Sequence, residues 1–150
     1  MKTLKVLSGI ALVAMLASFA PIGGDGFTLR VNNKLVIEHY FTSKAVTPHV
    51  SLGVFSSKDA VSISYSECGT VGKNRKLALK DQAGNVLKEW KFSDTDGLNS
   101  GMVIPGSEIM AFKKTDRKTF TITYTSQVVS TGRLLAELVL ENEAQVTSKK

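Results

Sequence analysis

Cysteine and histidine are scarce in this sequence, which has one cysteine, Cys68, and two histidines, His39 and His49, among 150 residues. A single cysteine excludes an intrachain disulfide and a zinc site built from four cysteines. Only three prolines and twelve glycines are present, which excludes a collagen-like or low-complexity chain. With 43% hydrophobic and 21% charged residues, the chain is also too apolar to be wholly disordered. The length predicts one folded domain rather than two.

The first twenty residues have the composition of an export signal. Lys2 and Lys5 precede an apolar run from Val6 to Ala20 that contains only a few small or hydroxyl residues. A basic segment followed by such a run is typical of a secretory signal peptide, and the run is too short for a membrane-spanning helix. The sequence therefore predicts a signal peptide over residues 1–20. It predicts an exported protein, periplasmic or secreted, with no stable membrane span after the signal is removed.

The rest of the chain carries a mild excess of basic residues. The signal segment contains two of the 19 Lys and Arg residues, so 17 remain against 13 Asp and Glu, a net charge of +4. A dedicated nucleic-acid-binding domain is more basic than this, so we expect no nucleic-acid partner. We expect a flexible linker over 21–26, one folded domain over 27–141 and a polar tail over 142–150.

Apolar and hydroxyl side chains alternate along two segments. In 61–66, serines alternate with Val61, Ile63 and Tyr65, and in 119–125, threonines alternate with aromatic and branched apolar residues. This alternation predicts strands with one buried face and one hydrated face. We expect the second of these strands to continue to Val129.

Weaker patterns predict the other elements. Further strands are expected over 27–31, 34–41, 50–55, 76–80, 86–92, 102–104 and 133–141. Asn32 and Asn33 predict a tight hairpin turn, because asparagine tolerates positive φ. Ser107 is expected to cap one helical turn that continues to Lys114.

The last expected strand contains both helix-forming and strand-forming residues. We favour a strand because it follows a Thr131-Gly132 turn and closes the sheet. In that strand, the alternation places Leu134, Ala136, Leu138 and Leu140 on the core side.

Seven to eight short strands, separated by turns and without a βαβ rhythm, predict an all-β fold. We expect an antiparallel β-sandwich, for which an immunoglobulin-like topology is one arrangement. The expected core residues are Val61, Ile63, Tyr65, Leu77, Leu79, Trp90, Phe92, Phe120, Ile122 and Tyr124.

Three neighbouring sequence motifs are similar to motifs found in other proteins. They are Tyr-Ser-Glu-Cys-Gly from Tyr65, Gly-Lys-Asn-Arg from Gly72, and the Leu-x-Leu-x-Asp-x-x-Gly hairpin from Leu77. Over residues 60–140 the chain resembles small exported β-sandwich proteins that have no assigned activity. The resemblance implies a fold and no particular function.

The connection between the strands at 61–66 and 76–80 has an unusual composition. It combines Glu67 and Cys68 with two glycines and the cations Lys73 and Arg75. Glycines can turn backbone N–H groups toward an anion, and the cations add charge. The spacing does not match a P-loop. The alternative interpretation is a polar connection whose glycines adopt positive φ.

A second basic group lies between 113 and 118. If this group and the connection at 73–76 share one end of the sandwich, they would bind an anionic glycan, a lipid head group or a protein. Otherwise both are solvated loops. The candidate ligand-binding residues are Glu67, Cys68, Lys73, Arg75, Lys114 and Arg117.

No pattern for catalysis or metal binding is complete. Cys68 is either a buried thiol or a nucleophile, but no Cys–His family signature and no Gly-x-Ser-x-Gly motif is present. The soft-metal candidates, namely the two histidines, Cys68, Met102 and Met110, lack close ligand spacing. The segment from Asp94 to Asn99 departs from a calcium loop in its glycine position. We therefore expect no catalytic residue, metal ion or cofactor.

The leading hypothesis is an exported, non-enzymatic binding or accessory module. Two alternatives stay open. One is an enzyme or redox protein that depends on Cys68, and the other is a carrier of copper or calcium.

Overall fold

The protein is an all-β sandwich. A computed structural model describes residues 24–44, 46–67, 72–95, 100–114 and 118–141. The expected signal segment and polar tail lie outside these residues. The described elements, in chain order, are β1 (Gly26–Val31), β2 (Lys34–Tyr40), β3 (His49–Ser51), β4 (Ala60–Ser66), β5 (Lys76–Lys80), β6 (Val86–Lys91), β7 (Met102–Pro105), α1 (Gly106–Met110), β8 (Thr119–Thr125) and β9 (Arg133–Val139). The described part of the chain thus contains nine strands, one in each segment where a strand was expected, although the fold as a whole was expected to have seven to eight.

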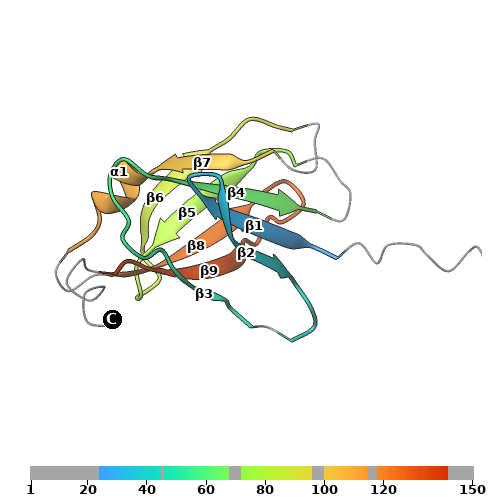
Figure 1. Cartoon of the computed structure of the whole chain (residues 1–150). Coiled ribbons are helices and arrows are strands. Elements are labelled where there is room, and N and C mark those ends of the chain that lie inside the picture. The colour runs from blue at the N-terminus through green and yellow to red at the C-terminus, as the bar shows by residue number, and fades with distance from the viewer. Residues whose placement is uncertain (1–23, 45, 68–71, 96–99, 115–117, 142–150) are drawn as a thin grey trace, which may run out of the picture.

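The strands form two sheets that pack face to face (Figure 1). The four-stranded sheet has the order β2-β1-β4-β7, and the five-stranded sheet has the order β3-β9-β8-β5-β6. Neighbouring strands are antiparallel except for β3, which pairs parallel to β9. The predicted antiparallel β-sandwich is therefore confirmed, and this edge contributes its one parallel pair among the described strands. Because the chain crosses from β2 to the other sheet before β3, it arrives there running in the same direction as β9.

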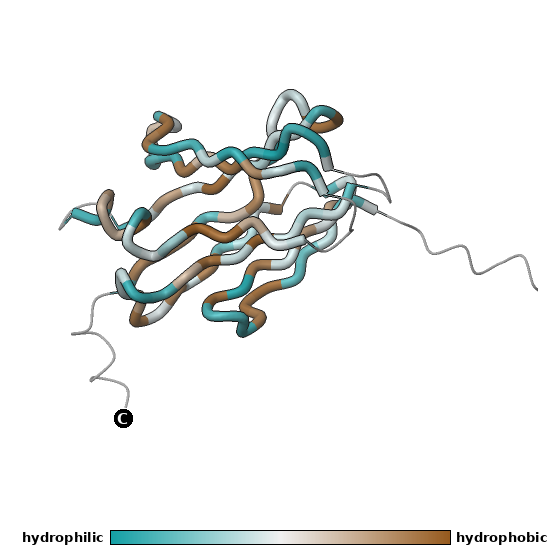
Figure 2. The backbone as a smooth tube through the Cα atoms, turned by 90° about the horizontal axis from the view of Figure 1, so that it is seen from above, coloured by the Kyte–Doolittle hydropathy of each residue, from teal (hydrophilic) through white to brown (hydrophobic). Residues whose placement is uncertain are grey.

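The alternating segments supply the core, as predicted. Val61, Ile63 and Tyr65 of β4 point inward and are at most 8% exposed. Figure 2 shows hydrophobic and hydrophilic residues alternating along the strands. The other confirmed core predictions are Leu77, Leu79, Phe120, Ile122 and Tyr124, each 0% exposed. Two central strands, β5 and β8, therefore bury the same face of the five-stranded sheet.

Trp90 and Phe92 differ from the prediction, because they are only half-buried and pack against the core from its margin. The reason is their position in the sheet. Trp90 lies on β6, which is an edge strand, and Phe92 directly follows it. The Trp90 indole N–H instead donates to Glu108 of α1 at 2.6 Å.

Both expected tight turns form. Asn32 and Asn33 adopt φ of 50° and 67°, so the β1–β2 hairpin closes with two residues. Gly132, with φ of 81°, precedes β9. Strand β8 ends at Thr125, earlier than expected, because Ser126 turns the chain and its hydroxyl accepts the N–H groups of the two valines at 128 and 129.

Strand β9 contains an irregularity that the alternating pattern does not reveal. Thr123 pairs with Leu134 while Ile122 pairs with Ala136, which leaves Leu135 as an extra residue. This bulge reverses the two leucines, so that Leu135 is fully buried and Leu134 is 41% exposed. The expectation that Leu134 faces the core is wrong for this reason.

The short helix begins two residues earlier than expected and ends at Met110. Its N-cap is Pro105, and Ser107 makes no capping hydrogen bond. The Gly106 N–H donates to the Asp59 carbonyl at 2.6 Å. A Cβ atom at Gly106 would lie 2.5 Å from that same oxygen, so the close approach requires glycine. The start of α1 is thus fixed by a long-range contact.

The four sheet edges are poorly suited to pairing with another chain. The long edge strands β2 and β6 each contain a register shift, and both carry lysines. Strands β3 and β7 have only three and four residues, and β7 ends in Pro105. Bulges, charge, short length and proline all disfavour edge-to-edge association. Strand β3 is shorter than the expected 50–55.

Candidate functional site

The four predicted ligand-binding residues that the structure describes, Glu67, Lys73, Arg75 and Lys114, do not form one site. Cys68 and Arg117 lie outside the described residues. Lys73 and Lys114 are exposed, as expected for loop cations. Glu67 and Arg75 are buried, at 2% and 6% exposure.

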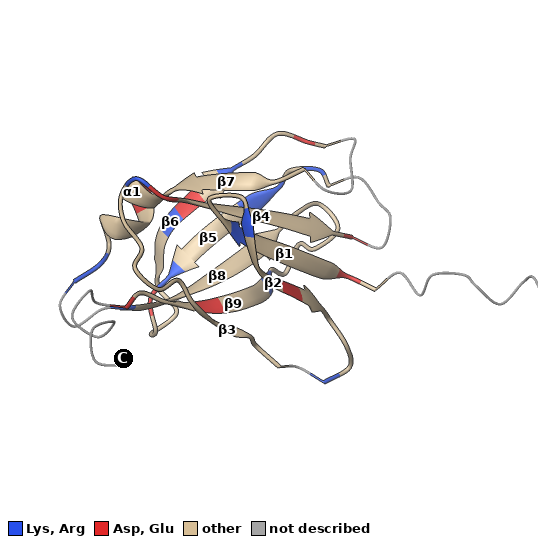
Figure 3. Ribbon diagram, in the orientation of Figure 1, with Lys and Arg blue, Asp and Glu red and all other residues tan. Residues whose placement is uncertain are grey.

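The two basic loops lie at opposite ends of the sandwich. Lys76 of β5 pairs with Thr125 at the end of β8, whereas Lys80 pairs with Thr121 near its start. Accordingly, the Lys73 carbonyl accepts from residue 127 beyond β8, and the Lys118 carbonyl accepts from residue 140 at the other end. Figure 3 shows the cations after α1 well away from those that precede β5. The two basic groups therefore do not meet the condition of sharing one end of the sandwich.

Arg75 is a structural residue. Its Nε and Nη2 donate to the Ser93 carbonyl at 2.9 and 2.8 Å, and Nη1 donates to the Ser100 carbonyl at 3.0 Å. The guanidinium thus joins the two ends of the connection between β6 and β7. The Asn74 N–H, which donates to Asp94 at 2.8 Å, adds a further link to that connection. Because these donors are occupied and buried, the side chain has little capacity left for a ligand.

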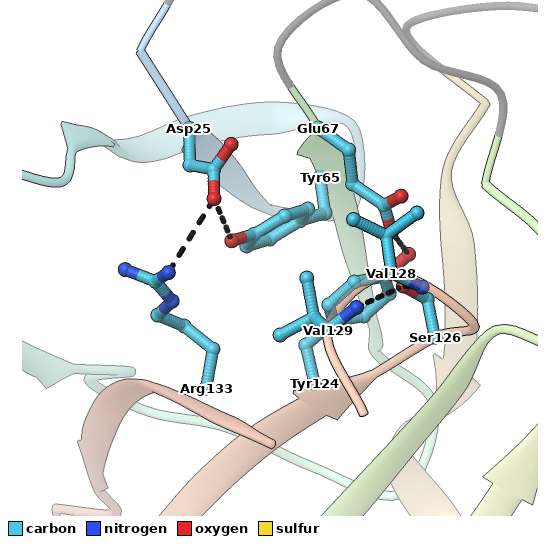
Figure 4. Close-up of polar contacts among 8 residues, drawn as sticks. All are labelled: Asp25, Tyr65, Glu67, Tyr124, Ser126, Val128, Val129 and Arg133. Carbon is cyan, nitrogen blue, oxygen red and sulfur yellow. Dashed lines mark hydrogen bonds and ion pairs between the residues drawn. The ribbon is translucent and has the colours of Figure 1, made fainter. Parts of the chain in front are cut away.

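Glu67 belongs to a polar cluster at the end of the sandwich where β4 and β8 finish (Figure 4). The Tyr124 hydroxyl donates to Glu67 at 2.6 Å, and the Tyr65 hydroxyl donates to Asp25 at 3.2 Å. The two tyrosine rings stack with centres 4.2 Å apart. The cluster therefore combines two aromatic rings, two hydroxyls and two carboxylates in one packed unit.

Burial determines the ionisation of this cluster. It raises the pKa of Tyr65, and the negative charge of Asp25 raises it further. Burial also raises the pKa of Tyr124, together with the hydrogen bond to Glu67. Both phenols therefore stay protonated at neutral pH and act as hydrogen-bond donors. Neither is suited to act as a general base.

Arg133 lies at the open side of the cluster. Its Nη2 is 3.4 Å from Asp25, and its guanidinium carbon lies 4.8 Å from the centre of the Phe41 ring. Figure 4 shows the Asp25 carboxylate between Tyr65 and Arg133. The ion pair and the cation–π contact together orient the guanidinium. The side chain nevertheless remains 40% exposed.

A cavity of about 310 Å³ adjoins this arginine. It lies between β9 and the connection that follows β2, and its lining includes Arg133, Lys44 and the apolar side chains of Phe41, Val46 and Leu134. Within the described residues Lys44 forms no ion pair. The cavity therefore presents two cations beside an apolar wall. Sequence analysis missed it, since Lys44 and Arg133 are isolated cations far apart in the chain.

The candidate soft-metal ligands are separated in the fold. His39 packs against the rings of Phe27 and Phe41, whereas exposed His49 lies 3.1 Å from Glu137. Met102 is fully buried. In the part of the chain that the structure describes, no group of three or more His, Cys, Asp or Glu residues is placed to hold a metal ion. The segment at 94–99, which departs from a calcium loop in its sequence, lies mostly outside that part.

Comparisons with known proteins do not add a function. A scan of protein-family models and a search of curated proteins both found no match to this chain, in agreement with the expectation of no named family. Across the described ranges, no helix has the length and apolar composition needed to cross a membrane.

Proposed function

We propose that the protein is an exported, non-enzymatic binding module whose ligand is anionic and binds in the cavity between Arg133 and Lys44. Export is supported by the signal pattern of residues 1–20. The observation that carries the proposal is the pairing of two cations with an apolar wall in one cavity.

The chemistry of Arg133 favours an anion. A guanidinium offers several N–H donors in a planar fork that matches a carboxylate or a phosphate. The contacts with Asp25 and Phe41 orient this fork and involve only part of its donor set. Lys44 supplies a second charge on the same cavity. An oriented cation loses less conformational entropy on binding than a mobile one.

The apolar side chains of the cavity narrow the ligand class. Phe41, Val46 and Leu134 are suited to contact an aliphatic or aromatic group, and Val46 and Leu134 are 65% and 41% exposed. Of the anionic partners expected from the sequence, the cavity favours one that carries a carboxylate or phosphate beside an apolar group. Such a ligand would contact the cations and the apolar side chains of the cavity together.

The polar side chains beside the cavity form hydrogen bonds with one another, which supports a non-enzymatic role. Glu67 accepts from Tyr124, and Asp25 contacts both Tyr65 and Arg133. General acid–base catalysis needs a group with a pKa near the working pH, within reach of the substrate. The raised pKa values of the two buried phenols oppose such a role. A Cys68-dependent enzyme remains the alternative, and a Cys68→Ser variant distinguishes the two.

The proposal is tested with three probes that share one apolar chain, namely octanoate, octyl phosphate and octanol. Calorimetric titration is expected to detect the two anions and not the alcohol. Their affinity is expected to fall with ionic strength, and to fall in Lys44→Gln and Arg133→Gln but not in the matched surface variant Lys73→Gln. Equal binding of octanol, or unchanged binding of the anions in both cavity variants, would contradict the proposal. Retention of binding in Cys68→Ser is also expected.

A further inference from the structure

The outer face of the four-stranded sheet contains a second hollow, of about 200 Å³. Two rows of directly opposed residues form it. One row runs Tyr40, Gly26, Ser66, and the next runs Glu38, Thr28, Ser64. Gly26 has no side chain at the centre of its row, so the hollow is a consequence of that glycine.

Tyr40 forms one side of this hollow and is 61% exposed. A Cβ atom at Gly26 would lie 2.9 Å from a carbon of the Tyr40 ring, so the ring leans over the glycine. The Tyr40 hydroxyl donates to Glu38 at 2.6 Å, which fixes its position. The result is an oriented aromatic ring, largely open to solvent, on a rigid sheet.

Apart from Phe27, the remaining lining is polar and mostly uncharged. Thr28, Ser64 and Ser66 place hydroxyl groups on the floor, and Glu38 adds a carboxylate acceptor at the margin. The Thr28 hydroxyl accepts from Arg30 at 3.2 Å. Hydroxyl groups both donate and accept hydrogen bonds, and a carboxylate only accepts them. A ligand that suits this lining carries several hydroxyl groups of its own.

We infer that this hollow is a binding subsite for one unit of a neutral saccharide, with the sugar ring stacked on Tyr40 and its hydroxyl groups bonded to Glu38 and the floor. A sugar ring has an apolar face of C–H groups that fits the face of an aromatic ring, and a rim of hydroxyl groups. The Glu38 carboxylate disfavours an anion at this position. The floor of hydroxyl groups disfavours an apolar peptide, and the bulge in β2 disfavours an added strand.

This subsite is independent of the Arg133–Lys44 cavity. Tyr40 and Phe41 are consecutive and lie on opposite faces of their segment, since successive side chains of an extended chain alternate. Phe41 lines the anion cavity, whereas Tyr40 lines the hollow. Neither proposal needs the other.

The test is an array of immobilised neutral oligosaccharides, followed by titration of each bound oligosaccharide in solution. The full-length mature protein is expected to bind at least one of them. Tyr40→Ala is expected to weaken that binding by about tenfold or more, because the stacking surface is removed. Tyr40→Phe keeps the ring and is expected to retain more affinity than Tyr40→Ala.

Two controls separate the possible causes. Val103→Ala removes an exposed apolar side chain from the same sheet, and it is expected to bind as the unsubstituted protein does. Lys44→Gln reports on the anion cavity and is expected to leave saccharide binding unchanged. Failure of the protein to bind any neutral oligosaccharide would overturn the inference, as would equal binding by Tyr40→Ala with an unchanged melting temperature. Either result leaves the octanoate experiment unaffected.

Discussion

Two tyrosine–glutamate pairs in this protein have the same hydrogen bond and opposite surroundings. Tyr124 donates to Glu67 at 2.6 Å, and Tyr40 donates to Glu38 at 2.6 Å. The first pair is buried, with Tyr124 0% and Glu67 2% exposed, whereas Tyr40 is 61% exposed and Glu38 is also exposed. The length of a hydrogen bond therefore does not indicate whether it contributes to stability or to ligand binding. Its exposure to water is the better indicator.

The position of each tyrosine in its sheet explains the difference. Tyr124 lies on β8, a central strand, and points toward the opposite sheet, where its ring stacks on Tyr65. Tyr40 is the last residue of β2, an edge strand, and points away from the core. A buried donor or acceptor that loses its partner keeps its desolvation cost, but an exposed one bonds to water instead. We therefore expect the first pair to contribute to stability, and we propose ligand binding for the second.

The largest expected difference in stability is between variants that truncate the Tyr124 ring and the Tyr40 ring. Tyr124→Ala is expected to lower the free energy of unfolding by about 3–5 kcal/mol, the usual range for a large buried aromatic residue. Tyr40→Ala is expected to change it by less than about 1 kcal/mol, because most surface substitutions have small effects. Urea denaturation measures both. Similar losses for the two variants would show that the assignment by burial is wrong.

Two neighbouring cations, one buried and one exposed, are also expected to differ in their contribution to stability. Arg75→Met removes a buried guanidinium and leaves two carbonyl groups without their donors, so it is expected to cost about 2–3 kcal/mol of stability. Lys73→Met is the matched control on the same connection and is expected to stay within about 0.5 kcal/mol. Thermal melting of both variants distinguishes a structural Arg75 from a ligand-binding one. A stable Arg75→Met protein would restore the sequence-based hypothesis for this residue.

Alkaline pH is expected to act through the buried tyrosines. Burial raises the pKa of Tyr65 and Tyr124 above the ordinary value of 10.0. Above pH 10 the unfolded chain therefore releases protons that the folded protein retains, so stability is complete below pH 10 and falls as the pH rises. Melting temperatures across this range are expected to fall less steeply in Tyr124→Phe than in the unsubstituted protein. Parallel curves would contradict this account.

Tyr40 provides the comparison in the same titration. Its pKa is raised by the hydrogen bond to Glu38. Because Tyr40 is exposed, we expect it to ionise before the two buried tyrosines, as followed by NMR of the ring carbons.

Local patterns in the sequence predicted much of the sandwich. The alternation in β4 and β8 identified the core because each strand has one buried face. The Asn32-Asn33 turn was predictable from a backbone preference of single residues. These features depend on near neighbours in the chain.

Features set by distant contacts were not predictable in this way. The parallel pairing of β3 depends on the Pro48 carbonyl, which accepts from the Glu137 N–H at 2.9 Å. The bulge at Leu135 depends on the register of β8 against β9. No local pattern contains either contact.

The candidate site was not predicted, for the same reason. The segment from Glu67 to Arg75 was singled out for its composition, but its two charged ends are buried in internal contacts. The cavity between Lys44 and Arg133 forms only when the connection after β2 reaches β9. The hollow beside Tyr40 depends on which residues of three strands stand opposite one another.

The most direct test of the central claim compares Tyr124→Phe with Tyr40→Phe, since each variant removes one hydroxyl group and nothing else. Tyr124→Phe leaves Glu67 buried without this donor, so urea denaturation is expected to show a loss of about 1–3 kcal/mol. Tyr40→Phe leaves Glu38 to water, and its stability is expected to stay within about 0.5 kcal/mol of the unsubstituted protein. Equal losses, or a larger loss for Tyr40→Phe, would contradict the claim that burial separates the structural pair from the binding pair.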